Sequence, residues 1–105
     1  MTVQTVAKMA KALSALHNAV EAAARAAGPL SFDDTDIKQR MSSYKEVIRR
    51  QALLLQRLSR AAAANDWQAV TRITDLVRTS SLMLQTDAEF IIDHLRQRRM
   101  ARRAA

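Results

Sequence analysis

The feature that most constrains the fold is an apolar pattern that runs without a helix-breaking residue from position 70 to position 95. A second apolar stripe, Leu76, Met83 and Phe90, lies about 100° to one side of it. The apolar arc is therefore about 200° wide, against about 100° for an ordinary surface helix. One neighbouring helix does not cover such an arc, so this segment must contact two partners, or contact one and leave an apolar stripe for something else. The main pattern alternates steps of four and three residues: Val70, Thr74, Val77, Ser81, Leu84, Ala88, Ile91 and Leu95.

Two more helices are predicted before this one. Residues 2–27 carry a strict heptad repeat, which is typical of a helix packed along its length. Gly28-Pro29 ends that helix, because glycine suits a left-handed cap and proline cannot continue the hydrogen-bond ladder. The chain contains one Gly and one Pro, so turns are scarce and long helices are expected.

The second predicted helix covers residues 32–64, and the third covers residues 67–100. Ser31 or Thr35 is the expected N-cap of the second helix. Asn65-Asp66 is the expected break, with Asn in the C-terminal cap and Asp as the next N-cap; one bent helix is the alternative. Residues 101–105 are predicted to be a frayed basic tail.

These lengths predict one all-α domain over residues 1–105, an antiparallel three-helix bundle. The second and third helices, each about 45 Å long, form a hairpin on which the bundle is built. The first helix is shorter, and alanines occupy the later positions of its seam. We therefore expect it to cover the hairpin incompletely and to leave a surface that is a candidate groove for a dimer or for another partner.

Catalytic and metal sites find little support in the sequence. His17 and His94 each lie beside an apolar seam position, which is typical of flanking surface histidines. Glu89 and His94 are five residues apart, whereas a di-iron bundle motif needs them three apart. With no cysteine and no glycine-rich loop, we expect neither an enzyme nor a cofactor or metal.

The chain has a net charge of +7, and its last ten residues contain a cluster of arginines and no acid. Such a cluster attracts nucleic acid, anionic lipid or an acidic protein, or it is a solvated helix end where cations suit the helix dipole. No apolar run reaches the roughly 20 residues of a membrane span, and no secretory signal precedes residue 11, so a cytoplasmic location is predicted. The candidate basic contacts are Arg96, Arg98, Arg99, Arg102 and Arg103.

The second stripe of the third helix has two interpretations. It is either core against the first helix or part of a surface that binds a partner, for which methionine is well suited. Leu53 and Leu82 fall outside both arcs and are predicted to be exposed, and Trp67 is predicted to plug the end of the bundle. The residues predicted to anchor a partner are Leu54, Leu76, Met83 and Phe90.

The run from Leu55 through Asn65-Asp66-Trp67 to Val70 resembles small helical flagellar and type III export chaperones. In those proteins a leucine-bearing helix meets a Gly/Asn-Asp-Trp-like turn and then a second helix with periodic leucines. The resemblance covers about residues 52–85. It implies a cytoplasmic chaperone that holds an amphipathic helix of an export substrate in a groove.

The sequence thus predicts a non-enzymatic module that binds another protein by helix-in-groove recognition. The alternative is a small nucleic-acid-binding accessory protein that uses the arginine cluster, although helix-turn-helix spacing and interleaved aromatic residues are missing. The third possibility is a homo-oligomeric coiled coil or homodimer, in which the heptad of the first helix pairs with a second copy.

Overall fold

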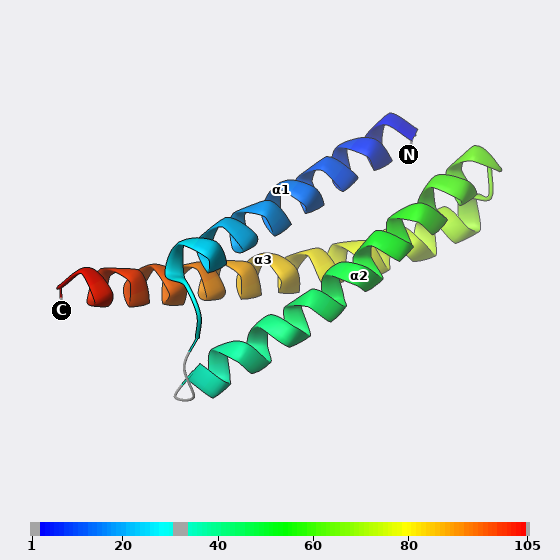
Figure 1. Ribbon diagram of the computed structural model, residues 1–105. Coiled ribbons are helices and arrows are strands. Elements are labelled where there is room, and N and C mark those ends of the chain that lie inside the picture. Colours follow the sequence, from blue (N-terminus) through cyan, green and yellow to red (C-terminus); the bar gives the residue numbers. More distant parts are fainter. Residues whose placement is uncertain (1–2, 31–33, 105) are drawn as a thin grey trace.

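The computed structural model describes residues 3–30 and 34–104, and it contains three long helices. They are α1 (Val3–Ala27), α2 (Thr35–Ala63) and α3 (Trp67–Ala104). Neighbouring helices in the chain run in opposite directions, and each helix contacts both others (Figure 1). The predicted all-α three-helix bundle built on the α2–α3 hairpin is confirmed.

The two predicted breaks have the backbone geometry that their residues favour. Gly28 has φ 75°, and its N–H donates to the carbonyl of Ala24 at 3.2 Å, which is the left-handed cap that glycine accepts most readily. Asn65 has φ 57°, and the following N–H of Asp66 bonds the carbonyl of Ala61 at 2.9 Å. This reversal of the chain shows that the alternative of one bent helix is wrong.

Asp66 then begins α3 in the predicted way. Its carboxylate Oδ1 accepts the backbone N–H of Ala69 at 3.2 Å, so it satisfies one of the N–H groups that have no partner within the helix. The short turn holds α2 and α3 side by side from their first contact. It therefore fixes the antiparallel register of the hairpin.

The start of α2 and the end of α3 differ from the sequence prediction. Asp34, not Thr35, is the N-cap residue, and Ser31 lies outside the described residues. The Asp34 side chain does not cap the helix; it is buried and accepts a hydrogen bond from Nη1 of Arg98. The end of α3 is not frayed at residue 101 but stays helical to Ala104, because alanine and arginine favour helix and nothing there breaks it.

In the part of the chain that the structure describes, the core consists of two clusters along the bundle axis. The cluster near the α1–α2 connection contains Val20, Ile37, Tyr44, Leu84 and Ile91, and the cluster near the α2–α3 turn contains Val6, Leu55, Leu58, Val70 and Val77. Every one of these residues lies on an apolar seam that the sequence shows. The seam positions therefore form the core as expected.

Tyr44 is a polar exception within the first cluster. Its ring is buried and stacks on His17 with centroids 6.2 Å apart, and its hydroxyl has no hydrogen-bond partner among the described residues. Burial raises the pKa of Tyr44 to about 12, and the negative charge of Glu21 adds to the increase. The site thus favours the neutral phenol strongly.

The seam of α1 packs unevenly. Val6 and Val20 are buried against the hairpin, whereas Met9, Leu13 and Leu16 between them are half-buried. The prediction that the first helix covers the hairpin incompletely therefore holds for the middle of α1. Trp67 corrects another expectation: it is largely exposed and does not plug the bundle, because the first position of α3 points about 90° away from that helix's buried face.

Candidate binding surface on the α2–α3 hairpin

Three large apolar side chains form a row on the outside of α3. Leu76, Met83 and Phe90 are 56%, 57% and 47% exposed, although side chains of these types normally lie inside a protein. They recur every seven residues, so they follow one face of the helix over about 21 Å. The structure brings these three predicted anchors onto one exposed face, and their role in binding stays a prediction.

The contact between Phe90 and α2 shows which residues of α2 lie opposite this row along the hairpin. The guanidinium carbon of Arg40 lies 4.0 Å from the centroid of the Phe90 ring, a cation–π arrangement. On the other side, the His94 ring stacks on Phe90 with centroids 6.2 Å apart. One end of the row is therefore partly covered by polar side chains, while Leu76 and Met83 are left more exposed.

Two residues of α2 continue the apolar surface across the hairpin. Because the helices are antiparallel, equal steps of seven from the Arg40–Phe90 contact place Val47 level with Met83 and Leu54 level with Leu76. Val47 and Leu54 are half-buried and pack against the core. Leu54 is thus partly a core residue, unlike the other three predicted anchors. We call this set the hairpin ladder: Val47, Leu54, Leu76, Met83 and Phe90.

Arginines border the ladder on the α2 side. Arg50 and Arg57 stand four residues before and three residues after Leu54, so they are its neighbours on the helix surface. Both are exposed. Residues 47–63 of α2 contain four arginines and no acid. A partner lying on the ladder therefore meets an apolar strip with a positive border.

Leu53 and Leu82 are exposed, as the sequence predicts. Leu82 precedes Met83 directly, but one residue turns a helix by about 100°, so its side chain lies off the ladder. Exposed leucines that stand alone are ordinary on protein surfaces. Leu82 is therefore a natural control for any substitution at Met83.

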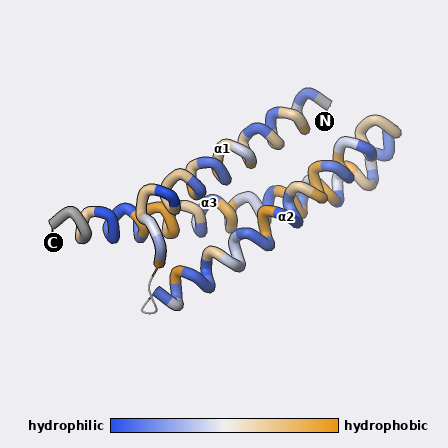
Figure 2. Tube along the Cα trace, in the orientation of Figure 1, coloured by the Kyte–Doolittle hydropathy of each residue, from blue (hydrophilic) through white to orange (hydrophobic). Residues whose placement is uncertain are grey.

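The structure divides the arginine cluster at the end of α3, where hydrophilic residues dominate (Figure 2). Arg98 is mostly buried and paired with Asp34, so it stabilises the bundle rather than facing a partner. Arg96 and Arg99 are exposed and border a depression of about 320 Å³ that alanines of α1 line. Arg102 and Arg103 lie on the part of α3 that continues beyond the other two helices (Figure 1), and their side chains are outside the described set.

Among the described residues, the histidines and acids do not assemble a recognisable reactive site. His17 lies 3.7 Å from Glu21 and stacks on Tyr44, while His94 stacks on Phe90. Across residues 3–30 and 34–104, no group of three or more His, Asp or Glu side chains is arranged to hold a metal ion. An absence of enzymatic activity stays a prediction.

Gln51 is a buried polar residue whose role the sequence analysis did not predict. It is 3% exposed, and its Nε2 donates to the carbonyl of Val77 at 3.2 Å and to Oγ of Ser81 at 2.8 Å. The signal was present: Gln51 and Ser81 each interrupt an apolar seam, and the hairpin register places them at nearly the same level. Neither helix pattern alone shows that the two interruptions meet.

No protein-family model, curated protein or solved structure matches this chain. Among the described residues, no helix is long and apolar enough to cross a membrane. The geometry of the hairpin ladder and its charged border is thus the basis for a functional proposal.

Proposed function

We propose that this protein is a non-enzymatic binding module in which the hairpin ladder holds an amphipathic helix of another protein. The observation that carries the proposal is the exposed row of Leu76, Met83 and Phe90 on a helix whose adjacent face is core. A seven-residue repeat on a hairpin matches the spacing at which a third helix presents its own apolar residues. Methionine at the centre of the row suits a surface that adapts to its partner.

The positive charge around the ladder favours a partner helix that carries acidic residues beside its apolar face. Arg50 and Arg57 border the ladder, and the chain as a whole carries +7. A second copy of this chain would bring the same positive border to the contact, which costs free energy, whereas acidic flanks attract it. In addition, α1 already uses Val6 and Val20 inside the chain, so less of its heptad seam is available to pair with another copy.

Site-specific photo-crosslinking in the native cell tests the proposal. A photoreactive phenylalanine analogue at position 83 is expected to capture a protein segment with apolar residues at helical spacing and acidic residues beside them. The same analogue at position 82, off the ladder, is expected to capture that segment much less. Equal capture from both positions, capture of a second copy of this chain, or capture of a non-helical segment would overturn the proposal.

A synthetic peptide of the captured segment makes the test quantitative. Met83→Asp is expected to weaken its binding about 10-fold or more, because a carboxylate would be desolvated against an apolar partner. Leu82→Asp is expected to leave the dissociation constant nearly unchanged. Loss of binding in both variants would point to charge alone and contradict recognition by the ladder.

The resemblance to export chaperones supplies one form of this function. A cytoplasmic chaperone of that kind would keep an export substrate's amphipathic helix in the groove until delivery. The segment that carries the resemblance, about residues 52–85, contains Leu54, Leu76 and Met83. Under this form the captured partner would be a substrate of a secretion apparatus.

Nucleic-acid binding is the second candidate, supported by the exposed Arg96 and Arg99 at the end of the longest helix. Arg96→Gln with Arg99→Gln tests it without disturbing Arg98, which pairs with Asp34. If both arginines contact phosphates, the slope of log affinity for random DNA against log salt falls by about two. An unchanged slope, or no DNA binding by the wild type at low salt, would exclude this role for them.

A further inference from the structure

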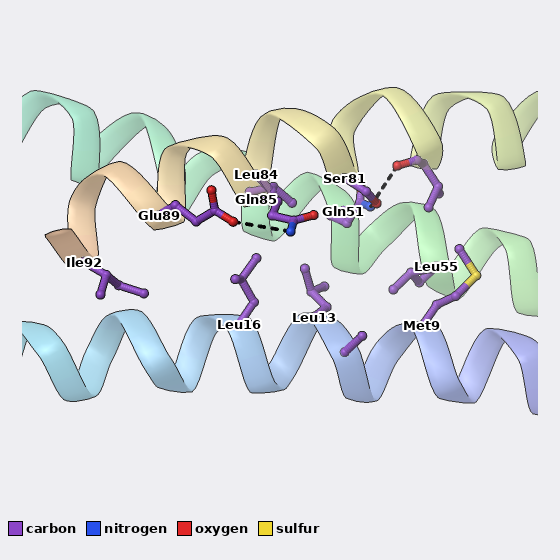
Figure 3. Close-up of a pocket in the computed structure, with 12 residues that line it drawn as sticks. Met9, Leu13, Leu16, Gln51, Leu55, Ser81, Leu84, Gln85, Glu89 and Ile92 are labelled. Carbon is purple, nitrogen blue, oxygen red and sulfur yellow. Dashed lines mark hydrogen bonds between the residues drawn. The ribbon is translucent and has the colours of Figure 1, made fainter.

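A separate cavity lies between α1 and α3, with α2 at its base. It has a volume of about 380 Å³, within the roughly 300–1,000 Å³ of small-molecule pockets. Figure 3 shows Met9, Leu13 and Leu16 directed from α1 toward the other two helices. The apolar part of the lining is completed by Ala12, Leu55, Val77, Leu84 and Ile92.

The cavity is closed at both ends by α1 itself. Val6 and Val20 are buried against the hairpin, while the seam residues Met9, Leu13 and Leu16 between them are half-buried. The open stretch from Met9 to Leu16 is therefore about 10 Å long. A partner helix cannot lie along a gap that closes at each end, so the dimensions favour a compact molecule over a protein segment.

One buried polar atom in the lining has no partner. The carbonyl of Val77 accepts from the Gln51 amide, which identifies the donating atom as nitrogen and leaves Oε1 as the remaining acceptor. This Oε1 is buried and has no hydrogen-bond partner among the described residues. The atoms around it leave this Oε1 almost no exposed area, so a ligand reaches it by displacing a lining side chain. A buried acceptor without a partner is costly, so a ligand that donates a hydrogen bond there gains affinity.

The mouth of the cavity carries further polar groups. Gln85 donates from Nε2 to Oε1 of Glu89 at 3.4 Å on the α3 side (Figure 3). The carboxylate of Glu89 repels an anion that approaches the mouth. The lining therefore disfavours fatty acids and other negatively charged amphiphiles.

We propose that this cavity binds a small uncharged molecule with an apolar body and one hydroxyl or N–H group, which donates to Oε1 of Gln51. The apolar body lies between Leu13, Leu16 and Leu84, and the donor points to α2. Alcohols and phenols about 10 Å long have this chemistry. The site is independent of the hairpin ladder, which lies on the other side of α3.

A matched pair of probes tests the donor. The two probes, 4-propylphenol and its methyl ether 4-propylanisole, share the apolar body, and only the phenol donates a hydrogen bond. Titration followed by ¹H–¹⁵N spectra is expected to shift amides near Leu13, Gln51 and Leu84. The phenol is expected to bind about 5- to 10-fold more tightly than the ether, the effect of one hydrogen bond of about 1 kcal/mol.

Gln51→Leu removes the acceptor while keeping a similar volume, and it is expected to bring the ratio of the two affinities to about one. Ala12→Phe places a large ring on a residue that lines the cavity, so it is expected to abolish binding of both probes. Ala7→Phe, at an exposed position on the opposite face of α1, is the control that is expected to keep wild-type affinity. Circular dichroism confirms that each variant is folded.

Three outcomes would overturn the proposal. The first is the absence of binding by either probe at millimolar concentration, which would mean that the cavity holds water only. The second is a preference for the phenol that persists in Gln51→Leu. The third is a set of shifted amides that lies on the hairpin ladder, which would assign the probes to a partner's site instead.

Discussion

Two buried leucines of the same type should respond differently to truncation because only one of them borders the cavity. Leu58 is 0% exposed and packs in the core cluster near the turn. Leu84 is 1% exposed but lines the cavity between α1 and α3. Both leucines lie in helix interiors, so Leu→Ala changes helix propensity equally at the two positions and the difference reports packing.

The expected magnitudes follow from the atoms removed and the space they leave. Each Leu→Ala removes three carbons from a buried position, which costs roughly 2.4 kcal/mol at about 0.8 kcal/mol per carbon. Leu58→Ala also creates a new void, which raises the total to about 3–5 kcal/mol. Leu84→Ala only enlarges a space that already reaches solvent, so its total stays at about 2–3 kcal/mol.

Urea unfolding followed by circular dichroism measures both free energies of unfolding. Met83→Ala, adjacent to Leu84 but 57% exposed, is the surface control and is expected to cost less than about 1 kcal/mol. Equal slopes against urea in all variants would show that the unfolded states are comparable. An equal or larger loss at Leu84 than at Leu58 would refute the cavity, and a loss of several kcal/mol at Met83 would refute the exposed ladder.

Three further predictions concern single positions. The folded-state pKa of Tyr44, about 12, exceeds the ordinary tyrosine value of about 10. The stability gained from the neutral phenol is therefore complete below pH 10 and disappears as pH rises through 12. Tyr44→Phe is expected to remove this loss of stability between pH 10 and pH 12. Thermal melts over that range check it, and an unchanged pH dependence in the variant would contradict it. Asn65→Gly is expected to leave the melting temperature unchanged or raised, whereas Asn65→Ala is expected to lower stability by about 1 kcal/mol, since φ 57° disfavours a Cβ. Equal effects of the two substitutions on stability would argue against the left-handed cap. Arg98→Gln is expected to cost about 1–3 kcal/mol by removing the guanidinium that donates to the buried Asp34, and a double-mutant cycle with Asp34→Asn that gives no coupling would contradict the pairing.

The hairpin ladder and the cavity show two ways in which a small bundle keeps apolar surface accessible. On the ladder, α3 has more apolar face than α1 and α2 cover, so Leu76 and Met83 face outward. In the cavity, α1 packs closely at Val6 and Val20 but not between them. The first arrangement suits an extended helical partner, and the second suits a compact ligand.

The sequence by itself determined the properties that belong to one helix at a time. The apolar periodicity located the core positions, including Leu84 and Ile91, and the surplus apolar arc of α3. Asn65-Asp66 marked the turn, because the left-handed cap and the N-cap depend on local backbone geometry. The exposure of Leu53 and Leu82 followed from helical angles alone.

Only the tertiary structure decided what each side chain meets across helices. The pairing of Asp34 with Arg98, 64 residues apart, has no signal in the local sequence, and it follows from the passage of α3 beside the start of α2. Gln51 was an unexplained interruption until the hairpin register placed Ser81 and Val77 against it. The cavity between α1 and α3 depends on the separation of two helices, which no periodicity within one helix fixes. Local patterns encode which face of a helix is buried, whereas the contacts on that face depend on register and spacing between helices.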